Sequence, residues 1–221
     1  RHGVDAVQVL FWRMLLALPL FLALAWWAGR GKAPFTLRDW AHIVGLGFCG
    51  YYLASLLDFL GLQYITASLE RLILYLNPTL VLLLSMLWLR VRVSPRQMIA
   101  IALSYSGVLI VFSHELNFEG ANVALGATLV FASALSYAVY LVASGEVVRR
   151  IGALRLPGAA TSVACVFGTA HLFVLRVPSA ALVPEPVIWL SLLNAVLTTF
   201  APVVMVMMAI ERIGAPLAAQ C

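Results

Sequence analysis

The sequence predicts an all-α polytopic membrane protein. Hydrophobic residues make up 63% of its 221 residues and charged residues only 10%, which is too little polar surface to cover a soluble core. A membrane-spanning helix needs about 20 mostly apolar residues in a row. Seven such stretches are predicted, at residues 7–27, 40–62, 68–89, 98–113, 123–144, 156–177 and 187–210.

Each predicted span is supported in turn by its length or its flanks. The first three are long apolar runs separated by polar connections at residues 28–39 and 63–67. The fourth is the shortest, and its support comes from charge, because without it the alternation of basic connections would be lost. The last three are again long, and they are separated by connections at residues 145–155 and 178–186.

Basic residues predict the orientation of the chain. The connections after the first, third, fifth and seventh spans hold ten of them: Arg30, Lys32, Arg38, Arg90, Arg92, Arg96, Arg149, Arg150, Arg155 and Arg212. The opposite side holds three, Arg1, Arg71 and Arg176. This asymmetry predicts that residue 1 is outside and that residues 90–96 are cytoplasmic. The net charge of +5 is scattered over short connections, so it does not indicate binding to nucleic acid.

A single offset of 148 residues lays the first span on the sixth and the second span on the seventh without a gap. Each helix lies five spans before its counterpart, and an odd step reverses the direction of crossing. We therefore expect an inverted repeat, as is found in many transporters. The expected domains are residues 1–121 and 122–221, which would be helices two to eight of a ten-helix parent.

Three ionisable residues mark the outer edge of the second and third spans. Asp58, Glu70 and Arg71 are costly in a bilayer unless they are paired or hydrated, so they are candidates for a function. One interpretation is an Arg71 to Asp58 ion pair that clamps the two helices together. The other is an outer gate or a proton-coupling group, with Glu70 on the same helical face as Asn77.

Two proline-interrupted helix centres predict a substrate path. Asn77 precedes Pro78 in the middle of the third span, and Asn194 and Thr198 precede Pro202 in the seventh. Proline frees a backbone carbonyl, and interruptions of this kind at mid-depth are typical of transporter binding sites. The alternative is that these residues only join helices to one another.

The fifth span carries a stripe of small and aromatic residues at helical spacing: Gly126, Ser133, Tyr137, Tyr140 and Ser144. Tyr137 and Tyr140 could stack on a substrate and donate hydrogen bonds to it, or the stripe could be a packing face. Ala100, Ser104 and Gly107 in the fourth span predict close packing within the bundle or in a homodimer. We find no phosphate-binding loop, metal-ligand spacing or nucleophile and base, so no cofactor, no metal site and no catalytic residue is expected.

The stretch at residues 57–74, LDFLGLQYITASLERLIL, followed by Asn77 and Pro78, resembles the third-to-fourth helix hairpin of EamA-type proteins of the drug/metabolite transporter superfamily. Residues 213–218 are similar to the corresponding hairpin of the second half. The resemblance implies ten helices in two inverted five-helix repeats, a central cavity, and export or exchange of small metabolites without ATP. One departure is Val91, because members often carry Glu at this point between Gly and Arg.

Together these features predict a secondary transporter of small metabolites in the plasma membrane, the inner membrane of a bacterium. It would work by alternating access around a mid-membrane cavity. Its expected partners are a small-molecule substrate and membrane lipid, without nucleic acid. A non-transporting membrane component or an inactive fragment is the alternative, and an intramembrane enzyme is a more distant one.

Overall fold

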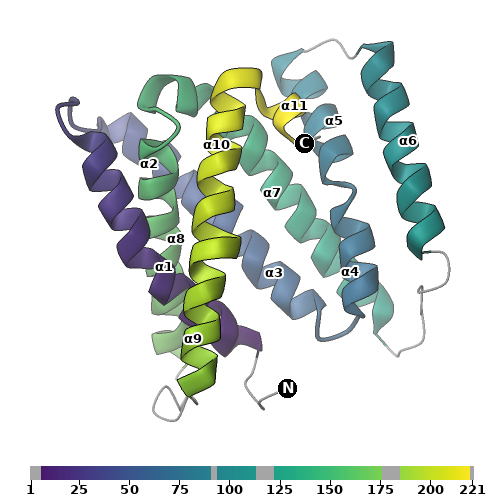
Figure 1. Ribbon diagram of the computed structural model, residues 1–221, viewed down its shortest axis with the longest axis horizontal. Coiled ribbons are helices and arrows are strands. Elements are labelled where there is room, and N and C mark those ends of the chain that lie inside the picture. The colour runs from purple at the N-terminus through teal and green to yellow at the C-terminus, as the bar shows by residue number, and fades with distance from the viewer. Residues whose placement is uncertain (1–5, 91–93, 113–121, 176–184, 220–221) are drawn as a thin grey trace.

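The computed structural model describes residues 6–90, 94–112, 122–175 and 185–219, and every regular element within them is a helix (Figure 1). In chain order the elements are α1 (Ala6–Gly29), α2 (Leu37–Gly47), η1 (Phe48–Leu53), α3 (Ala54–Gly61), α4 (Ala67–Leu74), α5 (Asn77–Leu89), α6 (Pro95–Phe112), α7 (Val123–Ile151), α8 (Arg155–Leu175), α9 (Glu185–Asn194), η3 (Ala195–Phe200), α10 (Ala201–Ile213) and α11 (Ala215–Ala218).

Four continuous helical stretches are long and apolar enough to cross a membrane: Leu37–Gly61, Ala67–Leu89, Val123–Ile151 and Ser191–Ile213. They match the second, third, fifth and seventh predicted spans. Helices α1, α6 and α8 lie at the other three positions, although the predicted ends of the fourth and sixth spans, at residues 113 and 177, fall outside the described residues. The prediction of an all-helical membrane protein is therefore confirmed.

Local residue chemistry explains several of the helix ends. Thr36 caps α2 through a capping box in which its hydroxyl accepts from the Asp39 backbone N–H and its own N–H donates to the Asp39 carboxylate. Thr66 caps α4 in the same position, with Leu69 N–H donating to its hydroxyl at 3.3 Å. Gly152 and Gly214 end α7 and α10 with φ of 104° and 82°, which only glycine adopts without strain.

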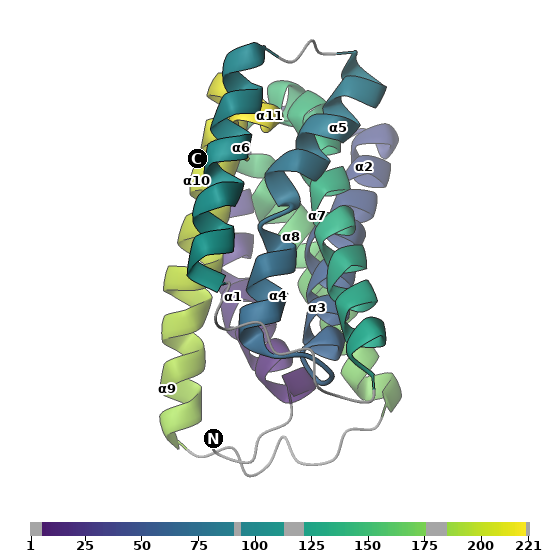
Figure 2. The ribbon, with the colours of Figure 1, turned by 90° about the vertical axis from the view of Figure 1, so that its right-hand side faces the viewer.

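The helices run between two ends of the bundle, and α7 lies at its centre (Figures 1 and 2). The connections α1–α2, α7–α8 and α10–α11, the end of α5 and the start of α6 all lie at the upper end in Figure 1, which is the end predicted to be cytoplasmic. Helix α7 packs against α3, α4, α5, η1 and α10, and its Val130, Ala134, Ala138 and Tyr140 are fully buried. The α1–α8 pair is the most extensive contact outside this centre.

Glycine allows the closest helix contacts, as small residues do in membrane bundles. A Cβ atom on Gly61 of α3 would lie 2.9 Å from the Gly126 carbonyl oxygen of α7, and one on Gly126 would lie 3.0 Å from the Gly61 oxygen. In contrast, a Cβ on Gly107 of α6 would meet no atom within 4 Å. The predicted packing of this residue inside the bundle is therefore not found, because α6 lies at the margin of the described chain (Figure 1).

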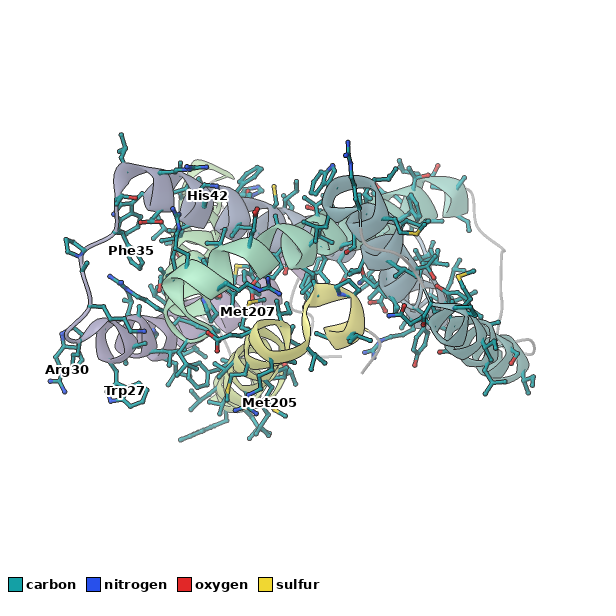
Figure 3. All side chains as sticks on the ribbon, turned by 90° about the horizontal axis from the view of Figure 1, so that it is seen from above. Trp27, Arg30, Phe35, His42, Met205 and Met207 are labelled. Carbon is teal, nitrogen blue, oxygen red and sulfur yellow. The ribbon has the colours of Figure 1, made fainter. Side chains whose placement is uncertain are left out.

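At the upper end, the end of α7 and the start of α8 contact the first turn of α2 and the residues just before it. Arg150 forms an ion pair with Asp39, which also belongs to the capping box. Arg155 donates a hydrogen bond of 2.8 Å to the Ala33 carbonyl, and its guanidinium lies 3.8 Å from the centre of the Phe35 ring. Figure 3 shows Phe35 between the ends of α1 and α2. These contacts join the two halves of the chain at this end.

Candidate functional site

Two helices of the bundle contain a turn of π-helix near their centres. The η1 segment interrupts the helix that begins with α2 and ends with α3, and η3 interrupts the helix formed by α9 and α10. In each, the N–H that follows the segment donates five residues back, Ala54 to Cys49 and Ala201 to Val196. Such turns are frequent at functional sites.

A cavity of about 260 Å³ lies among η1, η3, α7 and the break between α4 and α5. Twelve residues line it: Gly50, Tyr51, Ala54, Ser55, Asp58, Leu74, Asn77, Ser133, Tyr137, Thr198, Thr199 and Val203. Four of the eight predicted site residues are among them, namely Asp58, Asn77, Tyr137 and Thr198. The structure therefore brings together residues that are up to 153 positions apart, from Gly50 to Val203.

Three tyrosines form one wall of the cavity. The hydroxyl groups of Tyr51 and Tyr140 are 2.5 Å apart and their rings meet edge to face at 4.9 Å. Tyr137 stacks on Tyr140 with ring centres 5.8 Å apart. Tyr137 lines the cavity, whereas Tyr140 is fully buried behind it, where its hydroxyl lies 3.7 Å from the Met207 sulfur. Gly50 gives Tyr140 the necessary space, because a Cβ there would lie 2.3 Å from the ring.

The break in the third predicted span forms a second wall. Helix α4 ends at Leu74 and α5 begins at Asn77, with Pro78 in its first turn. Proline has no N–H, so the Leu74 carbonyl cannot accept the usual helical hydrogen bond from residue 78. The Asn77 side chain lines the cavity, and its Oδ1 atom is buried without a hydrogen-bond partner among the residues that the structure describes. A buried acceptor of this kind is costly unless a donor such as water or a ligand reaches it.

The η3 segment supplies the third wall through Thr198 and Thr199. The Thr198 hydroxyl donates to the Asn194 carbonyl at 2.8 Å and also contacts the Asn194 side chain. Asn194 therefore positions Thr198 but is not among the residues that line this cavity, and its predicted place on the substrate path stays a prediction. The Thr199 hydroxyl oxygen is buried without a hydrogen-bond partner, which adds a second unsatisfied polar atom to the lining.

The predicted charged residues lie at one side of the cavity. Asp58 lines it, whereas Glu70 and Arg71 lie beyond it in the first turn of α4. Arg71 Nε is 3.5 Å from Glu70 Oε2, and the exposed fractions of the two side chains are 72% and 8%. This ion pair is formed within α4, and the clamp between Arg71 and Asp58 stays a prediction. The charges of Asp58 and Arg71 both act on the Glu70 carboxylate.

The sequence predicted no role for the other lining residues, although the helical spacing of some of them indicated that they share a face with a predicted site residue. Tyr51, Ser55 and Asp58 share one helical face by their spacing, so the first two could have been included with the third. Ser133 belongs to the same stripe as Tyr137, and its hydroxyl donates to the Ala54 carbonyl at 2.7 Å. Gly50 and Val203 carry no such signal, because their place depends on how η1 and η3 turn.

A second cavity, of about 450 Å³, lies at the upper end of the bundle. It is formed by the ends of α5, α7 and α10 together with α6 and α11, and its charged residues are Glu146 and Arg149. Both side chains are exposed. This second cavity opens at the end of the bundle, whereas the first cavity lies at the interrupted helix centres.

A bundle of apolar helices with a polar cavity at broken helix centres is the architecture of a membrane transporter. Comparison with known proteins agrees, because residues 1–113 match the model of the EamA-like transporter family. The chain belongs to this family, as the resemblance of residues 57–74 implied.

Two relatives support this assignment, and one solved structure shares the fold. The chain is 32% identical over 232 residues to the uncharacterized transporter YcbK of Bacillus subtilis (strain 168), covering 98% of this chain and 71% of that protein. It is 28% identical over 207 residues to an uncharacterized transporter of Archaeoglobus fulgidus, covering 91% and 69%. A crystal structure with 18% sequence identity matches the fold with a TM-score of 0.66, over 99% of this chain and 69% of that one.

Proposed function

We propose that the chain is a secondary transporter that moves small metabolites by alternating access, with the 260 Å³ cavity as its substrate site. The observation that carries this proposal is the position of the cavity, which lies where three helices are interrupted. Transporters of this kind bind substrate at such interruptions near the middle of the bilayer. Asn77, Tyr137 and Thr198 contact the substrate, while Tyr140 and Asn194 support the wall behind it.

The proposed topology has seven spans and an inverted repeat. Its support is that corresponding helices begin 148 residues apart, α2 at Leu37 and α9 at Glu185, and α4 at Ala67 and α11 at Ala215. The π-helical segments begin at Phe48 and Ala195, 147 residues apart. The helix from α2 to α3 runs downward in Figure 1 and the helix from α9 to α10 runs upward, as inversion requires. Residues 1–121 and 122–221 are the proposed repeats.

The contacts at the two ends of the bundle suggest how access alternates. The Arg150 to Asp39 ion pair and the Arg155 contacts close the upper end, which the basic residues place in the cytoplasm. At the other end, Asp58, Glu70 and Arg71 form the proposed outer gate, with Glu70 as the group that couples protons. We propose that the protein lies in the plasma membrane, the inner membrane in a bacterium.

Transport assays on Asn77→Ala test the proposal. Cells that express the chain are screened for uptake and efflux of a panel of labelled metabolites, and the variant is then compared on any metabolite that moves. We expect loss of transport with unchanged folding, because Asn77 lines the cavity with an unsatisfied oxygen. Asn122→Ala is the matched control, since Asn122 is exposed at the start of α7 and makes no side-chain cap. Transport by Asn77→Ala at the parental rate contradicts the assignment of the site.

A non-transporting membrane component is the second candidate function. It predicts that no metabolite in the panel moves in cells that contain the folded chain in the membrane. Transport that depends on Asn77 excludes it.

A further inference from the structure

The connection between α1 and α2 carries an excess of positive charge. Its residues, 28–38, include Arg30, Lys32 and Arg38 but no Asp or Glu. Arg30 and Lys32 are exposed, and neither forms an ion pair with another residue that the structure describes. Exposed cations in this condition attract an anion from outside the protein.

The carboxylates at the same end of the bundle are engaged elsewhere. Asp39 forms an ion pair with Arg150, and Glu211 accepts a hydrogen bond of 3.2 Å from the Ala153 N–H. Glu146 lies beside the second cavity, which is formed by the ends of α5, α7 and α10 together with α6 and α11. The connection between α1 and α2 therefore keeps its positive charge.

Helix α1 presents an apolar and aromatic face directly before these cations. Leu22 and Trp26 are one turn apart and both are exposed, and Arg30 follows one turn later. The Arg30 guanidinium lies 3.9 Å from the centre of the Trp26 ring. Trp27 is also exposed, and Figure 3 shows it with Arg30 at the end of α1, at the margin of the bundle. Apolar residues, then tryptophan, then a cation follow the order of acyl chain, interface and headgroup in a bilayer leaflet.

The turn after α1 places two further cations near Arg30. The Lys32 backbone N–H donates to the Gly29 carbonyl at 3.1 Å, and a Cβ atom on Gly152 would lie 3.3 Å from the Lys32 ammonium nitrogen. Arg155 packs on the same turn, because a Cβ atom on Gly29 would lie 3.6 Å from its Nε. The end of α7 beside Lys32 contributes only about half an elementary negative charge, so it does not neutralise this group of cations.

We propose that this surface binds the headgroup of an anionic phospholipid. We call it the headgroup surface, and it consists of Trp26, Trp27, Arg30, Lys32 and Arg155. The lipid phosphate lies between Arg30 and Lys32, and an acyl chain follows the exposed face of α1. Arginine matches phosphate with parallel N–H groups, and lysine binds it as a point charge. The proposal does not depend on transport, because it requires only that the chain lies in a membrane.

Native mass spectrometry of the purified full chain in detergent tests the preference. Dioleoyl phosphatidylglycerol and dioleoyl phosphatidylcholine have the same chains, but the first has a net negative headgroup and the second a neutral one with its own ammonium group. Each lipid is titrated separately, and the protein with one bound lipid is measured. We expect phosphatidylglycerol to bind more tightly, because both lipids bury the same apolar surface and only the first adds a net charge.

Variants assign the preference to the headgroup surface. Arg30→Gln combined with Lys32→Gln should weaken phosphatidylglycerol binding by roughly 5-fold for each cation, or about 25-fold together, and leave phosphatidylcholine binding unchanged. Arg90→Gln combined with Arg149→Gln is the matched control, because it removes two exposed charges at the same end of the bundle, beside the second cavity. The control should keep the parental affinity for phosphatidylglycerol.

Glycerophosphoglycerol, the same headgroup without acyl chains, distinguishes a membrane lipid from a soluble phosphate ester. We expect it to compete with phosphatidylglycerol only at a large excess, because it cannot use the exposed face of α1. Displacement of the lipid at equal concentration would assign the surface to a soluble ligand and overturn the proposal.

Three further results would overturn it. They are equal affinity of the parent for the two lipids, parental phosphatidylglycerol affinity in the folded Arg30 and Lys32 variant, and an equal loss in the control variant. If the double variant does not fold, the ranking of the two lipids on the unmodified chain and the single variant Arg30→Gln decide.

Discussion

A close approach of two helices gives a prediction whose size can be worked out from the structure. Gly47 in α2 is buried against α8, and a Cβ atom added there would lie 2.3 Å from the Ala160 carbonyl oxygen. Ordinary van der Waals contact begins at 3.4 Å, so Gly47→Ala requires the oxygen to move by about 1.1 Å. The oxygen belongs to the backbone of a fully buried residue, and α8 is also packed against α1. The whole helix must therefore shift.

The expected loss of stability follows from two opposing effects. Overpacking a well-packed interior costs about 1–3 kcal/mol. Replacing glycine by alanine inside a helix returns about 0.5–1 kcal/mol. Gly45→Ala provides the matched control, because it lies two residues away in the same helix and its Cβ would meet no atom within 4 Å. The difference between the two variants isolates the steric effect, about 1–3 kcal/mol.

Thermal unfolding in detergent, followed by tryptophan fluorescence, measures this difference. For a chain of this size 1 kcal/mol corresponds to a shift of about 2–4 °C, so Gly47→Ala should melt roughly 2–12 °C below Gly45→Ala. We also expect Gly45→Ala to melt at or slightly above the parent. A melting temperature of Gly47→Ala equal to or higher than that of Gly45→Ala would show that α2 and α8 are not packed as described.

Three further predictions concern other parts of the fold. Asp39→Ala should lower the melting temperature more than Arg150→Ala, because it removes both the capping box and the ion pair, and equal losses would contradict this. Gly107→Leu should change the free energy of unfolding by no more than about 0.5 kcal/mol, because a Cβ there enters open space, and a larger destabilisation in the same melting assay would contradict it. A Cys placed at Arg149 of an otherwise cysteine-free chain should be protected from an impermeant reagent applied outside intact cells, and rapid labelling would reverse the orientation.

Much of the site could be predicted from the sequence because its signals are local. Pro78 cannot continue a helical hydrogen-bond ladder, so a break beside Asn77 follows from chemistry alone. Asp58 is conspicuous because a charge in an apolar span has few alternatives to a functional role. Tyr137 and Ser133 lie on one stripe by helical spacing. These features do not depend on knowing which helices are neighbours.

The remaining features depend on three-dimensional packing. A π-helical turn has no distinct composition, so η1 and η3 could not be found before the helices were placed. The same limit explains Gly45 and Gly47, which the sequence presents alike although only Gly47 meets another helix. It also explains Tyr140, which is fully buried beside Tyr137 instead of lining the cavity, because a shift of about 100° around a helix decides between the two positions.

The π-helical turns have a consequence for how this cavity can diversify in evolution. A π turn closes its hydrogen bond over five residues instead of four, so it accommodates one residue more than an α turn. Losing one residue within η1 would return that segment to α-helical spacing, while α2 and α3 could keep the faces that they present to their neighbours. Descendants of this fold can therefore exchange cavity residues by gaining or losing a single codon in η1 or η3, a change that in an unbroken helix would rotate everything beyond it.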